Sequence, residues 1–178
     1  MNQVWPHLEH LDDRFDAVVQ YLNEHLQGDD QVVDLNCGDS RILQSLRPCH
    51  YTGTDAIETR DGRMFRARPT AKFIKSKDDK LTFQRIDTLM CWGIGGYEIS
   101  KEEVESPTIT QTIIKLIEKH RPHYVVVEAI QEYQSILRWI LDSIDEDYTI
   151  RIDEKMNLGE PREWKRQIYL LERTNETK

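Results

Sequence analysis

The stretch from Gln31 to Leu46 constrains the fold of this chain more than any other segment. It begins with a short apolar run, which is typical of a buried strand, and it ends with apolar residues at helical spacing. Between them lie five residues, Asn36 to Ser40, that tolerate a left-handed backbone or bond readily to main-chain groups. Asp39 or Ser40 is placed to cap the following helix. The segment therefore predicts a strand, a tight polar turn and a helix.

A second predicted strand, Tyr51 to Asp55, ends in a carboxylate. Main-chain amides at the start of a helix can hold an anion or the polar atoms of a ligand. An acid at the end of the neighbouring strand can accept two hydrogen bonds from a ribose diol. The turn and the acid together indicate an adenosine-containing cofactor.

These segments resemble motifs of the class I, Rossmann-like S-adenosylmethionine-dependent methyltransferases. V-V-D-L-N-C-G-D-S-R-I-L resembles their first motif, and Tyr51-Thr-Gly-Thr-Asp55 resembles the second. Ile86 to Gly93 resembles the strand that ends beside the transferred methyl group. Two glycines of the first motif are replaced by Asn36 and Ser40, whereas Gly38, where the cofactor comes closest, is kept.

The resemblance implies a set of cofactor-binding residues and S-adenosyl-L-homocysteine as the product. Asp34 would order the turn and the amino end of the cofactor, beside residues that line its methionine part. Asp55 would hold the ribose hydroxyls, Ala56 would lie against adenine, and Asp78 would meet the adenine amine if the alignment shifts by one residue from Lys77. Cys91 and Trp92 would lie near the transfer site. The set is Asp34, Asn36, Cys37, Gly38, Asp55, Ala56, Asp78, Cys91 and Trp92.

Methyl transfer from a sulfonium is a direct displacement, so alignment of the nucleophile can supply most of the rate. No catalytic residue stands out in the sequence. Trp92, in a predicted loop from Cys91 to Gly96, can be interpreted as a stacking partner for a substrate or sulfonium or as a cap on the core. Glu128, at the end of a predicted strand, is either a polar substrate contact or an exposed strand-end acid.

The remaining pattern predicts one α/β domain over residues 1–178, with an N-terminal helix in 1–28 and a Rossmann-like core in 29–178. The helix either packs on the sheet or forms a substrate lid that uses Trp5, His7 and His10. We expect a mostly parallel sheet of seven strands, or one fewer, with helices on both faces and a C-terminal antiparallel hairpin. The other predicted strands are 71–75, 86–90, 124–127, 148–152 and 167–171, and the other predicted helices are 109–120 and 133–144.

Composition limits the partners and the compartment. The net charge of −8 argues against a general nucleic-acid binder, so nucleic acid is not the favoured partner. The three cysteines lack metal-ligand spacing, and His120 and His123 flank a helix end, so no metal site is expected. Scattered cysteines and the lack of a signal pattern or of about 18 consecutive apolar residues favour a cytoplasmic protein without a membrane segment.

A basic segment runs from Arg60 to Arg85 and contains nine Lys and Arg residues but only three aspartates. It is either a solvated surface with flexible side chains or a dock for an acidic or phosphate-bearing partner. The sequence does not distinguish these two interpretations.

Three functional hypotheses follow, and the leading one is a transferase, an S-adenosylmethionine-dependent methyltransferase. Its acceptor would be a small molecule, a protein side chain or a nucleic-acid end, and neither the acceptor nor the oligomeric state is predicted. The alternative is a non-catalytic methyltransferase-fold binding or scaffold protein, with the basic segment 60–85 in contact with an acidic or phosphate-bearing partner. The departures at Asn36, Ser40 and Lys77 motivate it. A nicotinamide-dependent oxidoreductase is disfavoured because N-C-G-D-S-R does not fit G-x-G-x-x-G.

Overall fold

The structure, a computed structural model, describes residues 16–38, 40–55, 68–75, 81–94, 108–130, 133–144, 147–157 and 165–174. Its strands are β1 (Gln31–Leu35), β2 (His50–Asp55), β3 (Ala71–Lys75), β4 (Thr88–Ile94), β5 (Tyr124–Ile130), β6 (Tyr148–Asn157) and β7 (Lys165–Arg173). Its helices are α1 (Asp16–His25), the 3-10 helix η3 (Arg41–Gln44), α4 (Thr108–His120) and α5 (Gln134–Ile144). No helix in these ranges is long and apolar enough to cross a membrane.

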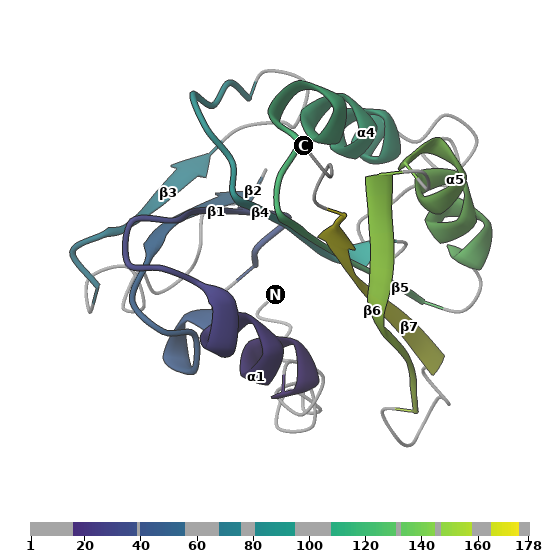
Figure 1. The fold of residues 1–178 in the computed structure, drawn as a ribbon, viewed down its shortest axis with the longest axis horizontal. Helices are drawn as coiled ribbons and strands as arrows, with labels where there is room; N and C mark the ends of the chain where they lie inside the picture. Colours follow the sequence, from purple (N-terminus) through teal and green to yellow (C-terminus); the bar gives the residue numbers. More distant parts are fainter. Residues whose placement is uncertain are drawn as a thin grey trace, which may run out of the picture.

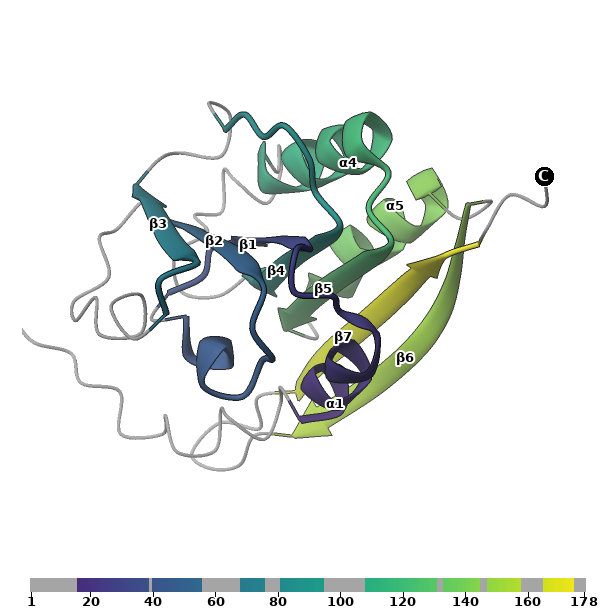
Figure 2. The ribbon, with the colours of Figure 1, turned by 60° about the vertical axis from the view of Figure 1, so that its left-hand side comes forward.

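The strands form one seven-stranded sheet in the order β3-β2-β1-β4-β5-β7-β6. Strands β1 to β5 pair in parallel, and β7 is antiparallel to both β5 and β6. The predicted mostly parallel sheet with a C-terminal antiparallel hairpin is therefore confirmed, with seven strands. Figure 2 shows the two long strands of this hairpin curving past α1.

Helices cover both faces of the sheet, as the sequence predicts. Figure 1 shows α4 and α5 over one face and α1 with η3 over the other. Successive residues of β1 point to opposite faces, which is the period of a strand. Val33 and Leu35 join the apolar cluster beneath α4 and α5, whereas Val32 joins the cluster beneath α1 and η3. Each face of the sheet therefore has its own core.

The helix predicted after the first turn is only the four-residue η3. Its apolar residues Ile42 and Leu43, and Leu46 just beyond its end, are all buried, at 1 or 2 % exposure, so a single turn already satisfies their helical spacing. The chain then passes through Pro48 and enters β2 at His50, which leaves no room for a longer helix.

The predicted fourth strand is placed too early, and the loop predicted after it is wrong over 91–94. β4 begins at Thr88 and continues through Cys91 to Ile94, and residues 95 and 96 lie outside the described ranges. The strand extends because Cys91 pairs with Leu35 of β1 and with Val127 of β5. A register shift between Cys91 and Ile94 marks the end of regular pairing.

Several other boundaries also differ from the prediction. β5 continues to Ile130, so Glu128 lies inside a strand, and β6 and β7 are both longer than expected. The described part of the N-terminal helix begins at Asp16. The predicted lid residues, Ala56, Lys77 and Asp78 lie outside the described residues, as does half of the basic segment.

Candidate cofactor site

The candidate site lies at the carboxyl ends of β1 and β2. β1 has β2 on one side and β4 on the other, so the strand order reverses at β1. Ligands of open α/β sheets bind at such a switch point, beyond the carboxyl ends of the strands. The turn from Asn36 to Ser40 leaves β1 at this point, and Asp55 ends β2 beside it.

The turn has a left-handed backbone at three alternate residues. The φ angles are 53° at Asn36, 52° at Gly38 and 52° at Ser40. Such a conformation costs about 1–2 kcal/mol for most residues, less for Asn and nothing for Gly. Main-chain bonds hold the turn: the Cys37 N–H donates to the Thr54 carbonyl at 3.0 Å and the Ser40 N–H donates to the Cys37 carbonyl at 2.8 Å. A glycine-type turn is thus retained with only one glycine among the three.

Gly38 and Asp55 meet across the two strand ends. The Gly38 N–H donates to Asp55 Oδ2 at 3.0 Å. Asp55 is only 6 % exposed, whereas a Cβ added to Gly38 would meet no atom within 4 Å. A carboxylate offers about four lone-pair sites, so Asp55 can accept several hydrogen bonds at once, and the space outside Gly38 beside it is open. This arrangement fits a ligand that presents a diol to Asp55 and passes close to Gly38.

A buried polar pair lies beneath the turn. The Tyr51 hydroxyl donates to Asp34 Oδ2 at 2.5 Å, and both residues are 1 % exposed. Burial, followed by the Asp34 charge, raises the pKa of Tyr51 well above its ordinary value. Ser40 is also 1 % exposed and lies beside the Tyr51 hydroxyl. The side chain that replaces a family glycine at Ser40 is therefore turned inward, away from the open space outside Gly38.

Cys37 is part of the turn but is not an activated thiol. Burial, followed by the charge of Asp34, raises its pKa far above the ordinary value, and Asp55 adds to the effect. Its Sγ–H donates weakly to the Gly38 carbonyl at 3.6 Å. The thiolate is the nucleophile and the metal ligand, so Cys37 is suited to neither role. Within the described ranges no group of three His, Cys, Asp or Glu residues can hold a metal ion.

Cys91 and Trp92 lie in the core. Cys91 is 0 % exposed beneath α4 and α5, and Trp92 is 5 % exposed on the opposite face, beneath α1 and η3. The interpretation of Trp92 as a cap on the core matches this environment, and the stacking interpretation does not. A direct role of either residue in cofactor binding remains a prediction.

Glu128 is neither an exposed acid nor an open substrate contact. It is 0 % exposed and accepts a hydrogen bond from Arg166 Nη1 at 3.0 Å, and Arg166 is 6 % exposed. The two residues are 38 positions apart and come together only because β7 pairs with β5. Breaking a buried ion pair costs about 3–5 kcal/mol, so we infer a structural role for Glu128.

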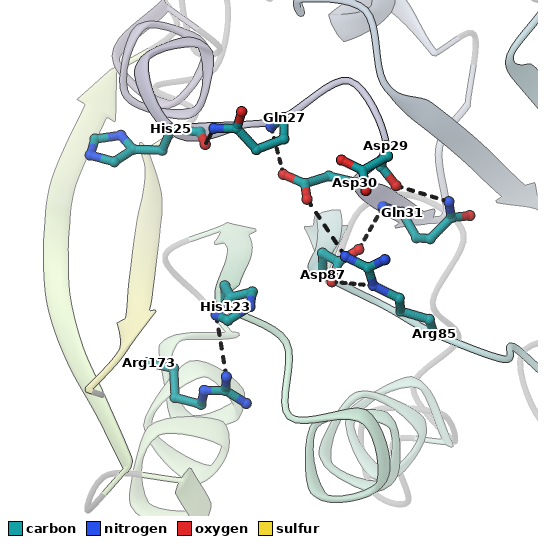
Figure 3. A network of polar contacts seen from close by, with 9 residues as sticks. All are labelled: His25, Gln27, Asp29, Asp30, Gln31, Arg85, Asp87, His123 and Arg173. Carbon is teal, nitrogen blue, oxygen red and sulfur yellow. Dashed lines mark hydrogen bonds and ion pairs between the residues drawn. The ribbon is translucent and has the colours of Figure 1, made fainter. Parts of the chain in front are cut away.

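The opposite ends of the central strands, their amino ends, carry a polar network that the sequence did not predict. Asp87, just before β4, accepts bonds from the Gln31 N–H at 2.8 Å and from Arg85 Nε at 2.7 Å. Figure 3 shows Arg85 placed between Asp87 and Asp30, with Arg85 Nη2 at 3.9 Å from Asp30 Oδ1. The Asp87 carbonyl also accepts the N–H groups of His123 and Tyr124. The acid Asp87 before a strand was the available signal, but its partners are distant in sequence.

The fold closely matches those of solved methyltransferases. The structure of magnesium protoporphyrin IX methyltransferase (ChlM) from Synechocystis PCC 6803 with bound SAM has a TM-score of 0.68 and 17 % identity, over 98 % of this chain and 86 % of that one. The structure of the N-methyltransferase NodS from Bradyrhizobium japonicum WM9 has a TM-score of 0.67 and 11 % identity, over 93 % of this chain and 97 % of that one. An rRNA methylase from Streptococcus thermophilus has a TM-score of 0.64 and 13 % identity, over 88 % of this chain and 94 % of that one.

The chain therefore has the class I, Rossmann-like methyltransferase fold. No protein-family model and no curated protein sequence matches it. At 11–17 % identity these three likenesses establish the fold alone, and the activity has to be argued from the site.

Proposed function

We propose that the protein is an S-adenosylmethionine-dependent methyltransferase. The observation that carries this proposal is the open space outside Gly38 beside the Asp55 carboxylate, at the switch point of a methyltransferase fold. An adenosine cofactor needs a close main-chain approach and an acid for its ribose hydroxyls. Both features are present on adjacent strand ends.

Each residue of the site has a distinct part in binding. Asp55 would accept bonds from the ribose hydroxyls, and Gly38 would let the cofactor pass close to the main chain. Asp34, buried beneath the turn, would attract the ammonium of the amino-acid end. The sulfonium supplies a methyl group that is already activated, so the chain has mainly to orient the two reactants and exclude water.

The acceptor is left open by the fold. The similar structures include enzymes named for a magnesium porphyrin and for rRNA, so the fold is compatible with small and large acceptors. A screen of labelled methyl transfer onto small molecules, proteins and RNA is the direct way to identify it.

The first experiment is isothermal titration calorimetry with S-adenosylmethionine and S-adenosylhomocysteine, with NADH as the control ligand. We expect micromolar binding of either sulfur ligand and no binding of NADH. Asp55→Ala should weaken that binding by about 1–3 kcal/mol because charge-assisted hydrogen bonds to the ribose are lost. Unchanged affinity in this variant would contradict the ribose assignment, and no binding to the wild-type protein would contradict the proposed function.

The second candidate is a non-catalytic binding protein of the same fold. A group of basic residues in and beside the edge strand β3 favours it. The Arg68 guanidinium donates to the main-chain carbonyls of Leu46 and Arg47 instead of to a carboxylate. Within the described ranges Arg47 and Lys72 also form no ion pair, and both are exposed. Basic residues that form no ion pair with the described part of an acidic chain are suited to a phosphate-bearing partner.

Charge reversal tests this second candidate. Lys72→Glu should weaken binding to a fluorescent single-stranded RNA in an anisotropy titration. The matched control is Lys115→Glu, the same charge change on the exposed face of α4. Equal effects of the two variants would show that only the net charge matters.

A further inference from the structure

The hydroxyl of Tyr51 has an environment unlike that of its ring. The ring belongs to the apolar cluster beneath α1 and η3, where a phenylalanine would pack equally well. The hydroxyl instead reaches Asp34 on the neighbouring strand at 2.5 Å, across 17 positions of sequence. A buried hydroxyl is costly without a partner, so this bond is the physical reason for a tyrosine in place of phenylalanine.

The bond fixes the direction in which Asp34 points. The side chains of Tyr51 and Asp34 lie on the same face of the sheet, because Val32 pairs with Tyr51 and Asp34 pairs with Gly53. A hydrogen bond from a neutral donor stabilises the charged form of a carboxylate. Tyr51 therefore holds the Asp34 carboxylate in one orientation, and as a neutral donor it adds no opposing charge.

The charge of Asp34 acts on the turn directly above it. Asp34 is the largest charged contributor to the raised pKa of Cys37, after burial. The turn residue Ser40 lies beside the Tyr51 hydroxyl. The pair thus lies directly beneath the main chain that would face the amino-acid end of the cofactor.

We propose that Tyr51 is a positioning residue for the cofactor, holding the Asp34 carboxylate in the orientation that attracts the ammonium of the cofactor's amino-acid end. This inference rests on the proposed function. It assigns Tyr51 no contact with the cofactor, because its hydroxyl acts through Asp34. It also divides the site into two parts, with Asp55 serving the ribose and the Tyr51–Asp34 pair serving the amino acid.

The test compares two ligands that differ in the amino-acid end. S-adenosylhomocysteine carries the ammonium, whereas 5′-methylthioadenosine keeps adenosine and the thioether but lacks the amino acid. By calorimetry, Tyr51→Phe should weaken S-adenosylhomocysteine binding about tenfold, the size expected for a hydrogen bond to a charged group. Binding of 5′-methylthioadenosine should change by less than about twofold, since the ribose contact at Asp55 is untouched.

Tyr21→Phe is the matched control variant. It removes a hydroxyl that donates to a carboxylate, Glu172, at 3.0 Å. Glu172 pairs with Tyr124 at the start of β5, at the opposite end of the parallel strands from the turn. We expect it to leave both ligands unaffected. In the Asp34→Asn background, Tyr51→Phe should cause no further loss, because the two residues act as one unit.

The outcomes separate the two proposals. If the wild-type protein binds S-adenosylhomocysteine and Tyr51→Phe weakens both ligands equally, Tyr51 only supports the turn and the inference is wrong while the proposed function stands. Unchanged binding of both ligands in Tyr51→Phe would also overturn it. If the wild-type protein binds neither ligand, the proposed function fails and this inference fails with it.

Discussion

The two ends of the central strands differ in how their polar groups are used. At the amino ends, Asp87 binds the Gln31 main chain and Arg85, and its carbonyl accepts two further N–H groups. At the carboxyl ends, the turn from Asn36 to Ser40 adopts the left-handed region three times and faces open space at Gly38.

The difference shows which end is built for stability and which for binding. Polar groups that bind one another fasten strands together and leave little capacity for a ligand. Backbone strain persists only where the surrounding structure imposes it, and it gathers at ligand sites. The amino ends of the central strands are therefore built for stability, and the turn at their carboxyl ends is built for binding. Mutations at the two ends should have different effects.

The largest expected effect is on stability, at the amino ends of the central strands. Asp87→Ala removes the acceptor of the Gln31 N–H and of Arg85, so we expect a loss of about 2–4 kcal/mol in the free energy of unfolding. Urea denaturation measures it. The affinity of the folded protein for S-adenosylhomocysteine should not change, and a large loss of affinity would mean that the two ends are coupled.

Gly38→Ala should affect binding more than stability. A Cβ there meets no protein atom but has to adopt φ 52°, which costs about 1–2 kcal/mol of stability. The methyl group would occupy the open space outside the turn and should weaken S-adenosylhomocysteine about tenfold or more. Gly28→Ala is the control, because its Cβ also meets nothing and its φ is not in the left-handed region. Equal affinities of the two variants would contradict a ligand at the turn.

Ser40→Gly should act in the stabilising direction. The change relieves the left-handed strain of Ser40, and the greater flexibility of glycine in the unfolded chain offsets part of that gain. We expect a net stabilisation of up to about 1 kcal/mol in urea denaturation. A clear destabilisation would instead show that the buried hydroxyl beside Tyr51 matters more than the strain.

The smallest expected effect is pH-dependent and concerns the contact between α1 and β7, near the amino end of β5. Burial raises the pKa of Glu172, but hydrogen bonds from Arg151 and Tyr21 outweigh it, and the pKa lies below its ordinary value. A lowered folded-state pKa stabilises the protein above the ordinary value, about 4.3, and this contribution is lost as the pH falls below it. Tyr21→Phe should reduce this acid dependence by less than about 1 kcal/mol in denaturation series from pH 7 to pH 3. An unchanged pH dependence would argue against the Tyr21–Glu172 bond.

Local patterns in the sequence were sufficient for the types and order of the elements. Alternating or continuous apolar runs predicted the strands, and the spacing of Ile109, Ile113, Leu116 and Ile117 predicted α4. The turn and Asp55 could be anticipated because both lie within short motifs. The structure adds the bond between Gly38 and Asp55, which depends on the pairing of β1 with β2.

The errors have non-local causes. The acid Glu128 suggested a strand end, but Arg166 stabilises it inside β5 from a distant strand. The residues after Met90 resembled a loop, yet pairing with β1 and β5 keeps them extended through Ile94. The Tyr51–Asp34 bond was also missed, because a tyrosine in an apolar strand gives no local sign of its partner.

The insertion of β7 between β5 and β6 has a consequence for synthesis on the ribosome. β6 precedes β7 in the chain but pairs only with β7 among the strands of the sheet. A nascent chain that has just completed β6 therefore leaves the edge of β5 open, with the main-chain groups of Val125, Val126 and Val127 unpaired on that side. An open apolar edge is prone to aggregation. Completion of the sheet waits for residues 165–173, so a chaperone would be most useful in the interval before they emerge.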